Sequence, residues 1–197
     1  MNFLAHLYLS GDNPDVMIGN FIADFVKGRG TAGQFNPGVV MGINLHRAID
    51  EFTDHHPVVQ LSKGRLRPKY RHYSGVIVDI FYDHFLARYW DEFHAELLPD
   101  YAGTVYDMLS ARQVELPEGT RWMLPYMIKG DWLTSYARLE GIQKALTGMS
   151  RRATFSSRME ESTNELRDHY TAFESEFRDF FPQLRDYSAN FLNKYSA

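Results

Sequence analysis

Four short segments of this chain carry polar or ionisable residues four positions apart inside otherwise apolar sequence. The pairs are Asn2/His6, Asn20/Asp24, His46/Asp50 and Asp79/Asp83. Residues at i and i+4 lie on one face of an α-helix, with Cβ atoms about 5–6 Å apart. Such a face would be buried here, and a buried carboxylate is costly unless it is paired or binds a metal. The pattern therefore predicts helices that converge on a metal site.

The chain has 197 residues, and we expect a single domain over residues 1–197. Hydrophobic residues make up 44% of it, which is enough for a large core. Because there is no cysteine, disulfides, thiolate metal sites and cysteine nucleophiles are excluded. The N-terminus lacks the basic leader of a signal peptide, and no stretch approaches the roughly 20 apolar residues of a membrane span. These features predict a cytoplasmic protein that does not associate with membranes.

Apolar spacing and start signals predict an all-α, single-domain helical bundle. Two Asn-Pro dipeptides mark helix starts, because Asn is a favoured N-cap and proline suits the first helical position. No alternating apolar runs joined by Asn-Gly or Asp-Gly turns appear, so a sheet is not expected. The expected helices cover about residues 1–9, 14–28, 37–56, 73–93 and 139–149, with two more beginning near Pro99 and Pro117.

The C-terminal segment carries a regular apolar stripe. From Leu166 to Phe191 its apolar residues alternate between spacings of four and three, which is a heptad-like pattern. We expect this stripe to close the bundle, and a dimer seam is the alternative, which leaves the oligomeric state open. Pro182 should divide the segment into two helices, because proline disrupts a helix interior.

The polar pairs suit a divalent cation such as Mn, Fe, Mg or Zn, and carboxylates favour the harder ions. A metal held by them would polarise a phosphoryl oxygen and lower the pKa of a bound water. Asn2 and Asn20 would orient ligands or substrate, and Asp54 or His84 would donate a proton or add a ligand. The candidate ligands are His6, Asp24, His46, Asp50, Asp79 and Asp83.

Each candidate taken alone also has a structural interpretation. Asp50 would then pair with Arg47, and Asp83 with Arg88. The metal site is favoured because four buried-looking pairs with no partner would carry a large energetic cost. His72 lies in polar surroundings, where a surface role is favoured.

A basic segment follows the polar pairs, although the net charge of −4 argues against general nucleic-acid binding. It is either a solvated loop around Pro68 or a docking surface for an acidic protein or a phosphate. Arg151 and Arg152 would extend that surface. Its residues are Lys63, Arg65, Arg67, Lys69 and Arg71.

Several segments resemble the bacterial acyl carrier protein phosphodiesterases, and the resemblance runs along nearly the whole chain. That family is a distant, all-helical relative of the HD phosphohydrolases, so the resemblance implies an HD-domain-like fold. The segments are NFLAHLYLS, GNFIADFVKG, GINLHRAIDEFTD, DIFYDHFLARYW, DWL with Tyr136, and GMSRR.

The resemblance implies an activity and a substrate. Members of the family hydrolyse the phosphodiester that joins 4′-phosphopantetheine to the serine of holo acyl carrier protein, a protein of fatty acid biosynthesis. They depend on a divalent cation, typically Mn²⁺. The likeness implies that the six candidate ligands handle metal and water, with Asp24, Asp83 and His84 in catalytic roles. HD enzymes carry an adjacent His-Asp doublet, whereas here the order is Asp83-His84.

Three other functions fit parts of the pattern. A helical phosphohydrolase that acts on a nucleotide or another small phosphoester is the nearest. A carboxylate-bridged di-iron oxidase would use Glu and Glu-x-x-His stripes, whereas these pairs are rich in Asp. A helical interaction module, in which Asp and His only bind Arg partners, would hold no metal.

Overall fold

The computed structural model describes residues 1–26 and 33–195, and within these ranges it contains helices and no strand. The predicted all-α fold is therefore confirmed. Buried apolar side chains from the whole length of the chain form one core. The helices are α1 (Phe3–Tyr8), α2 (Pro14–Ile22), α3 (Pro37–His55), α4 (Pro57–Tyr70), α5 (Ser74–Arg88), α6 (Leu98–Ala111), α7 (Glu118–Lys129), α8 (Trp132–Ser135), α9 (Leu139–Arg152), α10 (Thr163–Asp168) and α11 (Tyr170–Tyr195).

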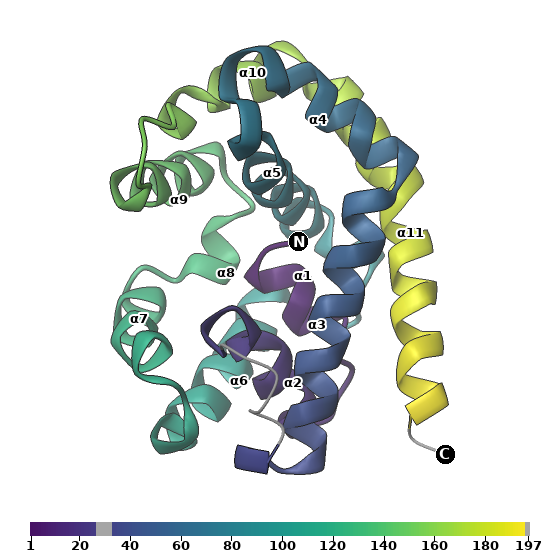
Figure 1. Ribbon diagram of the computed structural model, residues 1–197, viewed down its shortest axis with the longest axis vertical. Coiled ribbons are helices and arrows are strands. Elements are labelled where there is room, and N and C mark those ends of the chain that lie inside the picture. The colour runs from purple at the N-terminus through teal and green to yellow at the C-terminus, as the bar shows by residue number, and fades with distance from the viewer. Residues whose placement is uncertain (27–32, 196–197) are drawn as a thin grey trace.

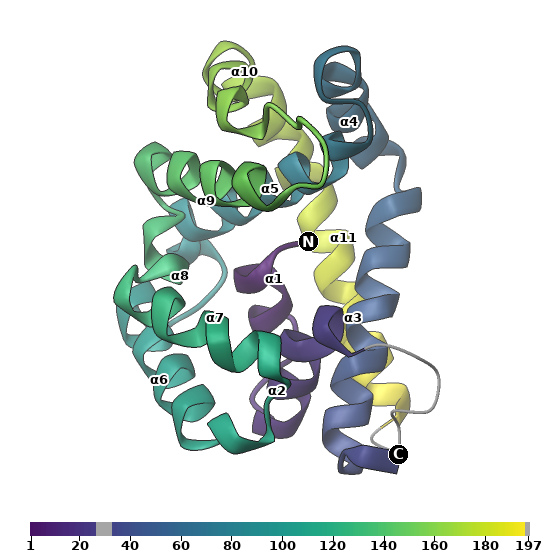
Figure 2. The same ribbon diagram turned by 60° about the vertical axis from the view of Figure 1, so that its left-hand side comes forward.

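The helices surround the short helix α1, so that the N-terminus lies inside the bundle (Figure 1). Helices α3 and α11 run side by side along one edge, while α6, α7 and α8 lie on the opposite side. Turning the molecule brings α9 and α7 forward and reveals α5 behind α9 (Figure 2). Among the described residues, no helix combines the length and apolarity needed to cross a bilayer.

Both Asn-Pro helix starts are confirmed. The Asn13 side chain accepts hydrogen bonds from the amides of Asp15 and Val16, and Asn36 accepts one from Val39. The first of these helices is shorter than predicted, because α2 ends at Ile22 and a 3-10 turn follows at Ala23–Phe25. The end predicted for it, residues 27 and 28, lies outside the described residues.

The structure contradicts one alternative and one prediction that rested on proline. Helix α4 continues through Pro68 to Tyr70, so the basic segment is helical and not a loop. Helix α11 continues through Pro182 to Tyr195 without dividing in two. An interior proline costs about 3 kcal/mol, but Phe177 and Phe181 are fully buried beside Pro182, and each such side chain contributes about 1.5–3 kcal/mol. Burial of the aromatic stripe therefore outweighs the cost.

Helices α2 and α3 approach each other more closely than side chains would permit. A Cβ atom added to Gly19 would lie 2.0 Å from the carbonyl oxygen of Val39. One added to Gly42 would lie 2.1 Å from the carbonyl oxygen of Val16. Glycine is thus required at both positions, and the close approach brings the end of α2 against the middle of α3.

Substitution of Gly42 by alanine should destabilise the protein. The added methyl would overlap backbone atoms, so the free energy of unfolding should fall by at least about 1–3 kcal/mol in denaturant titration. Gly103→Ala in α6 is the matched control, because a Cβ atom at that position would have no neighbouring atom within 4 Å. That variant should equal or exceed the wild type by up to about 1 kcal/mol. Equal stability of both variants would contradict the close contact.

Candidate metal centre

His46 is held in one orientation by the end of α2. Its Nδ1 donates a hydrogen bond to the carbonyl oxygen of Asn20 over 2.8 Å, so the neutral ring presents an unprotonated Nε2. That Nε2 lies 3.2 Å from Asp24 and 3.2 Å from Asp50. A backbone carbonyl that fixes the second ring nitrogen is a common support for metal-binding histidines.

His6 comes from α1 and stacks on His46. The ring centroids are 3.9 Å apart and the planes differ by 11°. His6 Nε2 lies 3.4 Å from Asp50 Oδ1 and 3.1 Å from the carbonyl oxygen of Met1. Both imidazoles are buried. Two histidines from different helices therefore meet at one carboxylate.

His6, His46 and Asp50 form a possible metal site. One ligand atom from each lies within 4.8 Å of the others. Two imidazoles and one carboxylate are a donor set that divalent transition metals accept. Asp24 adds an oxygen at the edge of the cluster, with 71% of its side chain exposed. The residues present fit a divalent cation, and four of the six predicted ligands lie together.

Asp79 is joined to the cluster through the N-terminal ammonium group of Met1. Its Oδ1 is 3.2 Å from the Met1 ammonium, which is also 3.4 Å from Asp50 Oδ1. Burial raises the pKa of Asp79 above its ordinary value. A cationic group therefore already bridges two of the predicted metal-binding carboxylates.

The pKa values of the two histidines are shifted in opposite directions. Burial lowers the pKa of His6 to about 4. Burial acts in the same direction on His46, but hydrogen bonds to Asp24 and Asp50 outweigh it and raise the pKa of His46 to about 9. Burial would raise the pKa of Asp50, yet hydrogen bonds from both histidines hold it well below its usual range. Asp50 is therefore ionised, as a metal ligand must be, whereas His46 has to release the proton on Nε2 before that nitrogen can bind a metal.

Asp83 does not join the cluster. Its carboxylate is fully buried and accepts hydrogen bonds from the amides of Leu4, over 2.8 Å, and Ala5, over 3.3 Å. These amides belong to the first turn of α1, which Asn2 leaves without a side-chain cap. Asp83 thus caps α1 from another helix and holds the segment that carries His6.

His84 is also turned away from the cluster. Its Nδ1 donates to the carbonyl oxygen of Tyr136 over 2.7 Å, and its Nε2 lies 2.9 Å from the Tyr170 hydroxyl. The ring is buried, and both of its nitrogens have partners inside the protein. The structure does not bring His84 to the residues predicted to act beside it.

The expected structural pairs Asp50–Arg47 and Asp83–Arg88 do not occur among the described residues.

A cavity of about 470 Å³ opens beside the cluster. Its walls come from the turn after α2, from α3, from the end of α4 and from the start of α5. His72, for which the sequence favoured a surface role, is exposed and also lines the cavity. The sequence around His72 does not indicate that it lines a cavity, because the cavity forms only where distant segments meet. The lining residues are Met1, Asp24, Asp50, Thr53, Asp54, Lys63, Arg67, Arg71, His72, Ser74, Gly75, Val76 and Asp79.

Three of the five residues in the basic segment are paired within the molecule. Lys63 Nζ lies 2.6 Å from Asp54, and Arg65 forms a two-pronged ion pair with Glu176. Lys69 Nζ lies 2.7 Å from Glu165 and 3.1 Å from Glu161. Arg65 and Lys69 stabilise the contact of α4 with the C-terminal part of the chain, and Lys63 stabilises its contact with α3. Arg67 and Arg71 are then the cations of the segment without an ion pair among the described residues, and both line the cavity.

Comparison with known proteins shows the family of this chain. The family model described as acyl carrier protein phosphodiesterase matches residues 1–184. The chain belongs to the acyl carrier protein phosphodiesterase family. It is 34% identical over 195 residues to an acyl carrier protein phosphodiesterase of Photorhabdus laumondii, covering 96% of each chain. It is also 34% identical over 191 residues to one of Escherichia coli O6:H1, covering 94% of this chain and 96% of the relative. No solved structure matches the fold significantly.

Substitution of Asp50 by asparagine should weaken metal binding without unfolding the protein. The carboxylate contacts Nε2 of both imidazoles, and its side chain is 41% exposed. We expect the Mn²⁺ affinity measured by isothermal titration to fall at least about 100-fold. Loss of a residue that only supports a ligand lowers metal affinity by up to about 100-fold, and loss of a ligand should cost at least as much. Glu51→Gln, which removes a charge from the next, exposed residue of α3, should leave the affinity unchanged.

Substitution of Asp83 by alanine should act on stability. It leaves the amides of Leu4 and Ala5 without their acceptor in the interior, which costs about 1–3 kcal/mol in the free energy of unfolding. Asp83→Asn retains an acceptor oxygen and should lose less. If the Asp83→Ala variant unfolded at the same denaturant concentration as the wild type, Asp83 would not stabilise α1 by capping it.

Proposed function

We propose that this protein hydrolyses the phosphodiester between 4′-phosphopantetheine and the serine of holo acyl carrier protein. The products are the apo carrier and 4′-phosphopantetheine. One observation carries the proposal: a chain of this family places two histidines and a carboxylate beside a cavity large enough for a phosphoester. Arginine partners for Asp24 or Asp50 are not found in the described part of the chain, which disfavours an interaction module.

We propose His6, His46 and Asp50 as the residues that hold a divalent ion, with Asp24 or Asp79 as further oxygen donors. Oxygen-rich donor sets favour the harder ions, and Mn²⁺ is our first choice. Such an ion would stabilise charge on a phosphoryl oxygen and make a bound water more acidic. Asn20 and Asp83 support the site from behind, by fixing His46 and α1.

Two exposed groups are placed for proton transfer in the cavity. Asp24 presents its carboxylate beside His46, so it is positioned to take a proton from water. The departing serine oxygen needs a proton, and His84 is unsuited to give it because both ring nitrogens are engaged inside the protein. We assign that role to His72, the imidazole that is exposed and lines the cavity.

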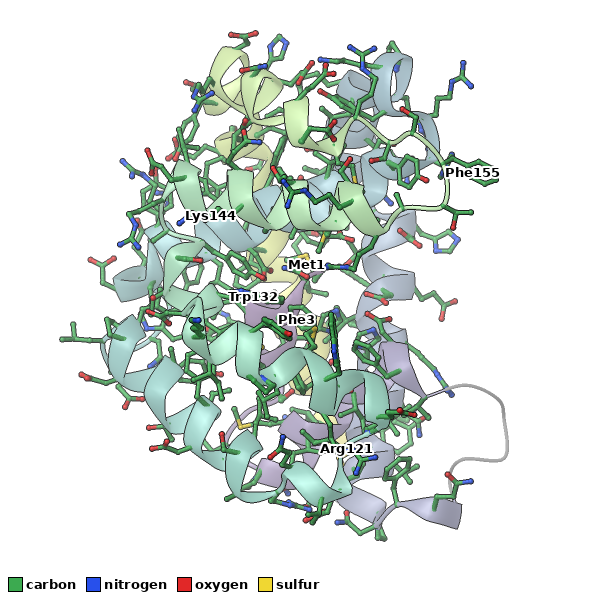
Figure 3. All side chains as sticks on the ribbon, turned by 90° about the vertical axis from the view of Figure 1, so that its left-hand side faces the viewer. Met1, Phe3, Arg121, Trp132, Lys144 and Phe155 are labelled. Atoms are coloured by element: carbon green, nitrogen blue, oxygen red, sulfur yellow. The ribbon has the colours of Figure 1, made fainter. Side chains whose placement is uncertain are left out.

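Carrier docking needs a surface other than the segment 63–71, since three of its cations are paired internally. We propose the end of α9, where Arg151 and Arg152 are exposed and have no ion pair among the described residues. Phe155 follows them and is 71% exposed, and the Tyr73 hydroxyl donates to its carbonyl oxygen over 3.3 Å. Figure 3 places Phe155 on the loop that leaves α9. That contact sets this surface beside the cavity lining at His72 and Ser74.

The proposed reaction predicts a direct result. Holo acyl carrier protein incubated with the purified protein and Mn²⁺ should lose the mass of its phosphopantetheine arm, as read by intact mass spectrometry. A chelator in excess should prevent the loss, and Asp50→Asn should reduce the rate at least about 100-fold. If verified holo carrier stayed intact while a nucleotide or a small diester was hydrolysed, the protein would be a phosphohydrolase with a different substrate.

Charge reversal at the end of α9 should weaken carrier recognition. The double variant Arg151→Glu/Arg152→Glu should raise KM for holo carrier at least tenfold and change kcat little, because the carrier is acidic. Added salt should raise KM for the wild type more than for this variant. Glu140→Lys, at the other end of α9, is exposed and serves as a charge control. An unchanged KM would exclude this end of α9 from docking.

A further inference from the structure

The cavity beside the metal centre has walls of opposite charge. Within the described part of the chain, four carboxylates and three cationic side chains line it. An anionic phosphodiester would be repelled by the carboxylates alone, so the cations determine whether it enters. The carboxylates are Asp24, Asp50, Asp54 and Asp79, and the cations are Lys63, Arg67 and Arg71.

Arg71 occupies a backbone conformation that favours glycine. Its φ is 51° and its ψ is −123°, at the position where α4 ends. A residue with a side chain costs of order 1 kcal/mol or more in such a region. The guanidinium has neither a hydrogen bond nor an ion pair in the described ranges, whereas the backbone carbonyl oxygen of Arg71 accepts a hydrogen bond from Ser74 Oγ over 2.6 Å. The side chain is therefore free to bind a ligand.

Arg67 lies one helical turn before Arg71 and lines the same cavity. One of its nitrogens donates to Gln60 Oε1 over 3.0 Å, which positions the side chain and leaves its other donors available. Lys63 is different, because its buried ammonium is already paired with Asp54 over 2.6 Å. Among the described residues that line the cavity, the two arginines are thus the cations that remain available.

The start of α5 adds a third favourable element. Ser74, Gly75 and Val76 form its first turn, and all three line the cavity. The helix has 15 residues and begins without a side-chain cap. A 3-10 turn, Arg71–Tyr73, leads into this helix, and the Ser74 amide donates to the carbonyl oxygen of Arg71. The helix dipole is therefore what this end contributes to binding an anion. Two guanidinium groups and a helix N-terminus therefore face the same space.

We propose that Arg67 and Arg71, with the first turn of α5, bind the non-bridging oxygens of the substrate's phosphate group. The role of this phosphate in a phosphodiester substrate rests on the proposed function, whereas the anion site itself rests on the cavity. Guanidinium groups offer paired donors that match phosphate oxygens. The anion would then lie between the arginines and the carboxylates that face the metal centre. Arg67 and Arg71 act in this proposal on the phosphate, and not on the carrier's acidic surface.

The test compares 4′-phosphopantetheine with pantetheine, which lacks the phosphate, by isothermal titration in Mn²⁺ buffer. Arg67→Ala and Arg71→Gly should each weaken binding of 4′-phosphopantetheine at least tenfold and leave pantetheine binding unchanged. Arg71→Gly should also unfold no earlier than the wild type, because glycine suits the backbone there. Arg71→Lys should recover part of the affinity. Arg121→Ala, an exposed residue of α7 outside the cavity lining (Figure 3), is the matched control and should bind like the wild type.

Inorganic phosphate separates this proposal from the proposed function. If holo carrier is not hydrolysed but inorganic phosphate binds the wild type at least tenfold more tightly than Arg71→Gly, the anion site stands and the substrate differs. Wild-type phosphate affinity in both arginine variants would overturn the proposal. So would a rise in KM for holo carrier with phosphate binding intact, since the arginines would then contact the carrier.

Discussion

The contact of Asn20 with both histidine-bearing helices organises the site. Its carbonyl oxygen accepts from His46 Nδ1, and its side-chain amide donates to the carbonyl oxygen of His6 over 2.8 Å and to Ser10 Oγ over 2.9 Å. One buried residue thus fixes a ring on α3 and the end of α1. This is possible only because Gly19 and Gly42 let α2 and α3 approach closely. A backbone contact therefore controls the orientation of the side chains that form the candidate metal site.

Four-residue spacing predicted the helical face of a polar residue but not what covers that face. His46 and Asp50 lie on one face of α3 and are in contact, with His46 Nε2 3.2 Å from Asp50 Oδ2. Asp79 and Asp83 also share a helix, yet one lines the cavity and the other is covered by α1. Only tertiary contact distinguishes them, since capping by Asp83 joins residues 79 positions apart. The helices and most of the cluster were predictable, and the role of each carboxylate was not.

The basic segment shows the same limit for charge. Five cations in nine residues suggested an exposed surface, and the sequence does not indicate that Glu176, 111 residues further along, pairs with Arg65. Proline was misleading for a related reason. Its local cost is fixed by geometry, whereas the burial that offsets it in α11 depends on aromatic contacts across the bundle. Local preferences are overridden where distant segments supply the stabilising contacts.

The six residues of α1 have a consequence for the order in which the protein forms. A helix this short does not persist alone in water, since isolated helices need about 12–15 residues to be even marginal. Its stabilising carboxylate, Asp83, is synthesised long after it. His6 therefore reaches its place only once α5 exists, although α1 is synthesised before α5. A nascent chain cannot assemble the complete donor set, so the site matures together with the fold.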